Sequence, residues 1–126
     1  MIPEWTTMVD AQAQIRQALT GLETEVTYQV LCRWPRTDDT GNLITVTELT
    51  NSQTETPVVD TLGYQLDIWT AEQDDVDELA PLVNAAMCGI GLRREYASPV
   101  EYQSDRYRKT LRYGRKVDKR TMRLID

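Results

Sequence analysis

The sequence predicts a single α+β domain of 126 residues, in which two main helices pack on one side of an antiparallel sheet. Two segments place apolar residues at helical spacing; of the three segments between them, two alternate apolar and polar residues and one is rich in β-branched residues. Short turns between neighbouring strands favour antiparallel pairing. The predicted order is α-β-β-β-α-β-β, and no repeat, low-complexity tract or linker divides residues 1–126.

The first helix is predicted over residues 7–21. Its apolar residues lie three or four positions apart and so form one face: Met8, Ala11, Ile15, Ala18, Leu19 and Leu22. Thr7 or Asp10 can cap the start of this helix, and Gly21 lies where a left-handed residue commonly ends one.

Three strands should follow. Residues 26–34 alternate up to Pro35, and Leu43–Leu49 is rich in β-branched residues. The most regular strand is Leu62–Thr70, with Leu62, Tyr64, Leu66 and Ile68 on one face and Gly63, Gln65, Asp67 and Trp69 on the other. The polar stretch 50–60 has no such alternation, and we predict that it is an exposed loop.

A second helix should begin at Asp74 or Asp75 and end at Gly89 or Gly91. Its apolar face consists of Val76, Leu79, Val83, Ala86, Met87 and Ile90. We expect this face to cover the apolar face of Leu62–Thr70, which would bury Leu66. Two further strands are predicted at about 100–105 and 106–117, and residues 119–126 can form a short terminal strand.

The charges are unevenly distributed. Residues 93–126 hold 11 Lys and Arg against five acids, a balance of +6, whereas residues 1–92 hold three against 15, a balance of −12; the sum is the overall −6. Three explanations stay open. The cations can protect sheet edges, they can bind an acidic face of another copy, or they can bind nucleic acid with Tyr102, Tyr107 and Tyr113.

No residue pattern predicts an enzyme. The chain has no His, two isolated cysteines, no phosphate-binding glycine loop and no nucleophile elbow. We therefore expect no catalytic, metal-binding or cofactor-binding residues, and no apolar run reaches the length of a membrane span. Cys32 and Cys88 are expected to be buried thiols. Helix capping explains Asp74 and Asp75 better than a metal site does, and Trp5, Trp34 and Trp69 are expected in the core or at an interface.

Several segments are similar to a known family. They are Tyr28-Gln-Val-Leu-Cys-Arg-Trp-Pro35, Leu43-Ile-Thr-Val-Thr-Glu-Leu-Thr-Asn51, Leu62-Gly-Tyr-Gln-Leu-Asp-Ile-Trp69, Met87-Cys-Gly-Ile-Gly-Leu-Arg-Arg94 and Leu111-Arg-Tyr-Gly-Arg-Lys-Val-Asp118. With these segments, and in this order from about residue 8, the chain resembles the tail-completion (tail terminator, or tail-to-head joining) proteins of long-tailed bacteriophages. In that family a strand with an apolar–Asp–apolar–Trp end leads into a helix, and the most specific feature here is the Tyr-x-Leu-Asp-Ile-Trp run of residues 64–69 with the preceding Glu-x-x-Asn of residues 48–51.

The resemblance implies a structural virion protein of the head–tail joint, assembled in the host cytoplasm. Its subunits would form a ring, commonly a hexamer, that caps the tail tube and meets the head-completion ring. DNA would pass through the lumen without specific binding. The alternative function is a nucleic-acid-binding or packaging accessory protein that uses the basic C-terminal strands.

The ring hypothesis assigns contacts between subunits to both charged regions. The cations are Arg106, Arg108, Lys109, Arg112, Arg115 and Lys116; their expected partners in another chain are Asp74, Asp75, Asp77 and Glu78 and the loop 50–60, with Asn51, Gln53 and Glu55. Reversing Arg108, Lys109 and Arg112 to Glu should then leave the monomer folded and weaken the oligomer.

Overall fold

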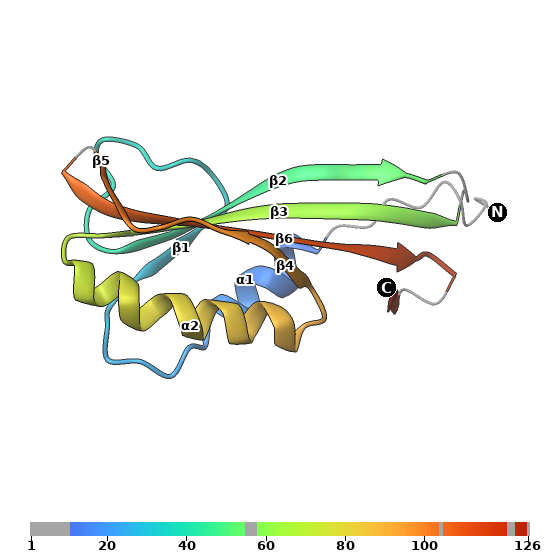
Figure 1. Ribbon diagram of the computed structural model, residues 1–126, viewed down its shortest axis with the longest axis horizontal. Helices are drawn as coiled ribbons and strands as arrows, with labels where there is room; N and C mark the ends of the chain where they lie inside the picture. The colour runs from blue at the N-terminus through green and yellow to red at the C-terminus, as the bar shows by residue number, and fades with distance from the viewer. Residues whose placement is uncertain (1–10, 55–57, 104, 121–122, 126) are drawn as a thin grey trace.

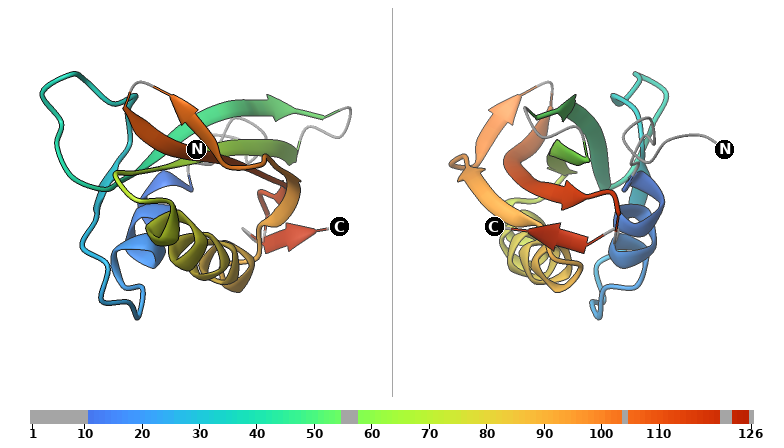
Figure 2. Two further views of the ribbon diagram at one scale, coloured as in Figure 1. Left: turned by 60° about the vertical axis from the view of Figure 1, so that its left-hand side comes forward. Right: turned by 90° about the vertical axis from the view of Figure 1, so that its right-hand side faces the viewer.

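The computed structural model describes residues 11–54, 58–103, 105–120 and 123–125. Within these residues, one sheet of seven strands has both helices on one side (Figures 1 and 2). The elements are α1 (Gln12–Thr20), β1 (Gln29–Leu31), β2 (Leu43–Gln53), β3 (Val59–Thr70), α2 (Gln73–Gly89), β4 (Arg93–Ala97), β5 (Glu101–Gln103), β6 (Arg106–Asp118) and β7 (Arg123–Ile125). The predicted α+β class is confirmed.

The long strand β3 is the centre of the sheet. It pairs antiparallel with β2 from Leu43↔Trp69 onward and with β6 from Val59↔Asp118 to Thr70↔Tyr107. Successive parts of β6 pair in turn with β5, β4 and β7. Because β3 has partners on both sides, its side chains are fixed alternately toward the helices and away from them.

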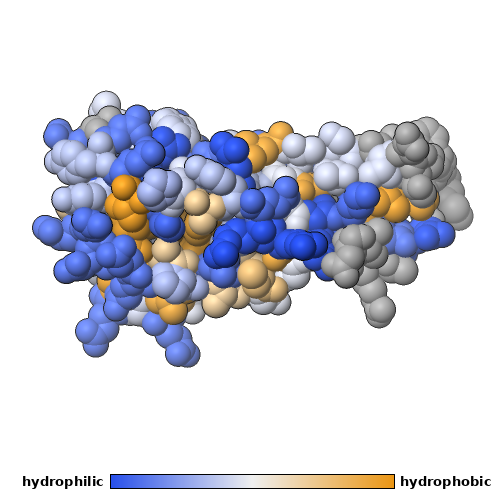
Figure 3. All heavy atoms as spheres, viewed as in Figure 1, coloured by the Kyte–Doolittle hydropathy of each residue, from blue (hydrophilic) through white to orange (hydrophobic). Residues whose placement is uncertain are grey.

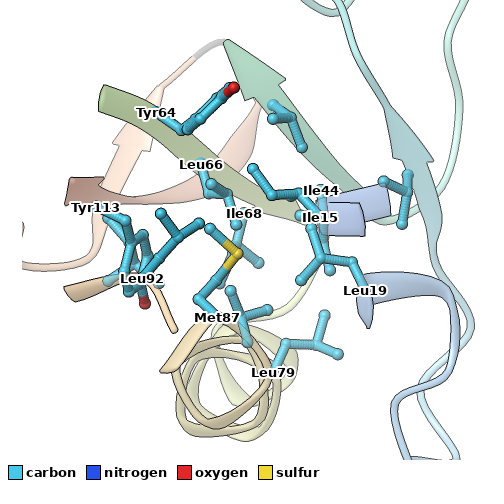
Figure 4. Packing of buried hydrophobic residues seen from close by; sticks show 14 of the residues in the cluster. Ile15, Leu19, Ile44, Tyr64, Leu66, Ile68, Leu79, Met87, Leu92 and Tyr113 are labelled. Atoms are coloured by element: carbon cyan, nitrogen blue, oxygen red, sulfur yellow. The ribbon is translucent and has the colours of Figure 1, made fainter. Parts of the chain in front are cut away.

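The core lies between β3 and the helices (Figure 4). Tyr64, Leu66 and Ile68 are fully buried there together with the stripe of α2, which confirms the predicted contact. The buried residues of the helices are Ile15, Leu19, Val76, Leu79, Val83 and Met87. Burying one such aliphatic side chain contributes about 1.5–3 kcal/mol, so this layer supplies most of the hydrophobic stabilisation.

The stretch 50–60 is not a loop, contrary to the sequence prediction. It forms a hairpin in which Asn51 pairs with Leu62 and Gln53 with Asp60, and the amide of Thr54 donates to the carbonyl of Val59 at 3.0 Å. With the paired end of β6 it forms an arm of residues 50–53, 59–63 and 114–118 that extends past the helices (Figure 1). In the arm the polar end of β2, residues 50–53, is held by backbone hydrogen bonds, so this part of the sequence needs no apolar period. Residues 55–57, with Glu55, lie outside the described part.

The first strand is shorter than predicted. Burial alternates from Val26 to Val30, but beyond it Cys32 and Trp34 are exposed; only Gln29–Leu31 is a strand, and it runs parallel to β2. Its partner strand begins at Leu43, opposite Gln29, so the residues before Gln29 have no ladder partner there. The sheet is therefore antiparallel except at this edge.

Two details at element ends also differ from expectation. Gly21 has φ −106° and is not left-handed, whereas Gly91, after α2, has φ 95°.

Strand β4 was not predicted, because all five of its residues are exposed and leave no alternation to detect. Met8 and the proposed caps Thr7 and Asp10 lie outside the described residues.

Candidate interaction surface

The face of the sheet that points away from the helices, called here the helix-free face, displays large hydrophobic side chains. In the described part of the chain four such residues are exposed, and three of them, Trp34 (52%), Leu49 (49%) and Tyr96 (46%), lie on this face. The fourth, Tyr102, contacts Tyr107, which packs against the core on the helix side. Leu49 and Tyr96 border one cavity, and Trp34 lies farther along the same face, against Trp69 and Arg108. Exposed large hydrophobic side chains on one face are typical of interaction surfaces.

A buried ion pair organises the centre of the helix-free face. Nη2 of Arg108 lies 2.9 Å from Oδ1 of Asp67, whose side chain is fully buried. The same carboxylate accepts hydrogen bonds from Nε of Arg108 (3.0 Å), from the hydroxyl of Thr110 (2.6 Å) and from the side-chain amide of Gln65 (3.0 Å). The strand register causes this arrangement, because Asp67 is directly opposite Thr110 and Trp69 is opposite Arg108.

Two tryptophans enclose the guanidinium of Arg108. Its central carbon lies 5.0 Å from the ring centroid of Trp34 and 4.8 Å from that of Trp69. The two rings meet edge to face at 5.4 Å, and Nε1 of Trp69 donates to the hydroxyl of Thr45 at 3.0 Å. Trp34 is thus held in one orientation although half of it is exposed.

The loop of residues 32–42 brings Trp34 over the sheet. Arg33 and Asp39 form an ion pair at 2.7 Å, and the amide of Arg36 donates to the same carboxylate at 2.7 Å. The hydrogen bond from Arg33 lowers the pKa of Asp39 well below its usual range, and that from Arg36 adds to this. The pKa of Arg33 is raised by the same contact. A cavity of about 320 Å³ lies between residues 34–37 of this loop and the side chains of Trp69, Gln103 and Arg106.

The cations predicted to face another subunit make contacts within the chain. Arg106 donates to the carbonyl of Asp39, Nζ of Lys109 to the carbonyl of Ser98 at 2.6 Å, and Nε of Arg112 to Gln65 at 3.0 Å. Lys116 is exposed on the arm and Arg115 is half-buried there. Reversing Arg108 to Glu is therefore expected to destabilise the monomer, and not to leave it folded as the sequence suggested. The new Glu would lie beside the buried carboxylate of Asp67.

The predicted acidic partners lie on the helix side. Asp74, Asp75, Asp77 and Glu78 belong to the first turns of α2, where hydrophilic side chains cover the surface (Figure 3). Asp75 accepts a hydrogen bond from Asn42 at 3.2 Å and Glu78 one from Thr24 at 2.8 Å. Within one chain these acids are therefore separated from the cations of the helix-free face by the sheet.

Other expectations about single residues had mixed outcomes. Cys32 and Cys88 are exposed, not buried: Cys32 follows the short strand β1 and Cys88 is on the outer side of α2. Among the described residues no group of three or more His, Cys, Asp or Glu is placed to hold a metal ion. Trp5 is outside the described part, and Asn51 and Gln53 belong to the arm.

No protein-family model matches the chain, and no curated protein sequence matches it either. Among the helices of the described residues, none is both long enough and apolar enough to cross a membrane.

Proposed function

We propose that this chain is a non-enzymatic structural subunit of a long-tailed bacteriophage virion, and that it forms a ring at the head–tail joint. The ring, a hexamer in this proposal, would cap the tail tube and bind the head-completion ring, with DNA passing through its lumen. The observation that best supports an assembling subunit is the helix-free face, on which Trp34, Leu49 and Tyr96 are all exposed.

The arrangement of Trp34 supports a contact role for that face. Interface residues that contribute most binding energy are often Trp, Tyr or Arg held in one conformation before binding. Arg108 and Trp69 hold Trp34 in this way. A partner would gain the apolar area without the entropic cost of ordering the ring.

The positions of the charges support contacts between unlike faces of two copies. The acids at the start of α2 lie on the helix side of the sheet, whereas Arg108, Arg112 and Lys116 of β6 lie on the helix-free face, so one copy can present acids to these cations of the next. Contacts of this heterologous kind close into a ring when the rotation between copies permits it. The arm, which extends past the helices, adds a second element that can reach a neighbour.

Nucleic-acid binding through the basic strands, the alternative function, receives less support. Arg106, Lys109 and Arg112 already donate hydrogen bonds within the chain, and Arg108 is paired with Asp67. Binding to phosphates would compete with these contacts.

Two measurements test the proposal. Purified protein is expected to form discrete oligomers in sedimentation velocity and closed rings in negative-stain electron micrographs. Mass spectrometry of phage particles from the encoding genome is expected to detect the chain. A protein that stays monomeric and is absent from particles would refute the proposal. A shift of duplex DNA at micromolar protein with a steep salt dependence would favour the alternative.

A further inference from the structure

Two facing glycines interrupt the side chains of the helix-free face. Gly63 of β3 and Gly114 of β6 are directly paired, and both point to this face. Gly63 forms the floor of a cavity of about 350 Å³, called here the glycine notch, and the side chain of Glu95, which lies over Gly114, lines the same cavity. Its walls are Leu49 and Thr50 from β2, Glu95 and Tyr96 from β4, and Arg112 from β6.

Backbone conformation does not explain these glycines. In the described residues only Gly41 and Gly91 are glycines with positive φ, so another residue could adopt the backbone angles of Gly63 and Gly114. Glycine weakens a strand interior and often marks a place where another group approaches the backbone. At Gly114 that group is a carboxylate, because a Cβ atom there would overlap Oε1 of Glu95 and lie 2.9 Å from its Cδ.

The carboxylate of Glu95 has no cation of its own. Within the described part of the chain it takes part in no hydrogen bond or ion pair, and the adjacent Arg112 donates to Gln65 and stacks on Tyr96, 5.2 Å from the ring centroid. The exposed side chains of Leu49 and Tyr96 border the notch. A partner that covered these apolar walls would also remove water from Glu95, at a high cost unless it supplied a positive charge.

We propose that the glycine notch receives a Lys or Arg side chain from a second copy of this chain. Such a side chain can lay its aliphatic stem on the backbone of Gly63, between Leu49 and Tyr96, and place its charge at Glu95. A second copy is the occupant that the charges favour, because residues 93–126 carry the balance of +6. Three exposed cations there are donors: Arg93, Arg94 and Lys116. This inference rests on the proposed self-assembly and names one of its contacts.

The first test is Glu95→Gln in the full chain, with self-association measured by sedimentation equilibrium. Loss of the charge is expected to weaken association about tenfold or more, because the incoming cation would be left unpaired. Glu101→Gln is the matched control, since Glu101 is an exposed acid of β5 outside the notch. It should associate like wild type, and both variants should unfold at the wild-type temperature.

A second variant fills the floor without changing any charge. A Cβ atom at Gly63 would lie 3.3 Å from Cβ of Thr50, a close contact that a small shift relieves, so Gly63→Ala should fold. Its methyl group occupies the place of the incoming stem, and association is expected to fall several-fold. Glu95→Lys should block association, and Arg93→Glu, Arg94→Glu or Lys116→Glu should restore it by exchanging the charges.

The outcomes separate this inference from the proposed function. If wild type associates and Glu95→Gln associates within about twofold of it, the notch contact is wrong while ring formation stands. The notch contact is also wrong if Glu95→Lys does not associate when combined with any of Arg93→Glu, Arg94→Glu or Lys116→Glu. If wild type remains monomeric at every concentration, both proposals fail.

Discussion

Asp67 and Arg108 form an ion pair, 2.9 Å from Nη2 to Oδ1, in which the Asp67 side chain is fully buried and that of Arg108 is 18% exposed. The pair lies on the helix-free face, outside the main hydrophobic core. It fixes the guanidinium that holds Trp34 and Trp69. The stability of this face and the orientation of its exposed tryptophan therefore depend on the same contact.

Replacing Arg108 by Met should destabilise the fold strongly. The variant keeps a long apolar side chain but leaves the buried carboxylate of Asp67 without its cation, which typically costs about 3–5 kcal/mol. Arg120→Met is the control, because Arg120 is 58% exposed in its pair with Asp118, and such surface pairs contribute about 0–1 kcal/mol. Urea denaturation measures both, and equal free energies of unfolding would contradict this account.

Leu66→Ala should lower the free energy of unfolding by about 2–5 kcal/mol, because Leu66 is fully buried between β3 and α2 and the substitution leaves a cavity. Leu49→Ala removes the same atoms from a residue that is 49% exposed, and should change stability by about 0.5 kcal/mol or less. Thermal or urea unfolding of the two variants side by side gives the comparison. If both variants lost a similar free energy of unfolding, the burial of Leu66 would not explain its contribution to stability.

The core could be predicted from the sequence, but the arm and β4 could not. Val76, Leu79, Val83 and Met87 repeat with the helical period because they face one apolar layer, so their pattern reports burial directly. The residues of β4 are all exposed, and the polar end of β2 is held by backbone hydrogen bonds. Where no side chain is selected for burial, the sequence has no period to detect.

The ion pair of the candidate surface was not predicted for a different reason. Alternation places Asp67 and Trp69 on one face of β3, and Arg108 and Arg112 on one face of β6. Alternation does not specify which residues of β3 and β6 are opposite each other, because the two strands are far apart in the sequence. Asp67 and Arg108 are separated by 41 positions. Arg108 was accordingly expected at an interface between subunits, and Asp67 was assigned only to a strand face.

The loop that carries Trp34 should respond to acid through Asp39. Because Arg33 lowers the pKa of this carboxyl in the folded state, Asp39 contributes stability that is fully present above its ordinary pKa of 3.8 and is lost as the pH falls below it. A titration followed by carboxyl NMR signals should find Asp39 ionised well below that pH. In Arg33→Gln the pKa should move up toward 3.8, and an unchanged titration would show that Arg33 is not the cause.

Trp34 and Trp69 should have opposite roles in stability and assembly. Trp69 is 5% exposed and donates a hydrogen bond to Thr45, so Trp69→Ala should reduce the free energy of unfolding by about 3–5 kcal/mol. Trp34 is 52% exposed and belongs to a loop, so Trp34→Ala should reduce folding stability by much less. Denaturation curves for the two variants test this difference before any assembly is measured.

The effect of Trp34→Ala on assembly tests the helix-free face as a contact surface. If Trp34 is a central contact residue, its removal should weaken self-association by about 2 kcal/mol or more, roughly thirtyfold, in sedimentation equilibrium. Tyr102→Ala is the matched control, because Tyr102 is more exposed, at 64%, but lies on the helix side with Tyr107. If loss of Tyr102 weakened association as much as loss of Trp34, exposed aromatic area in general, and not this face, would account for assembly. Association that survives Trp34→Ala unchanged would remove the main support for the helix-free face as the contact between subunits.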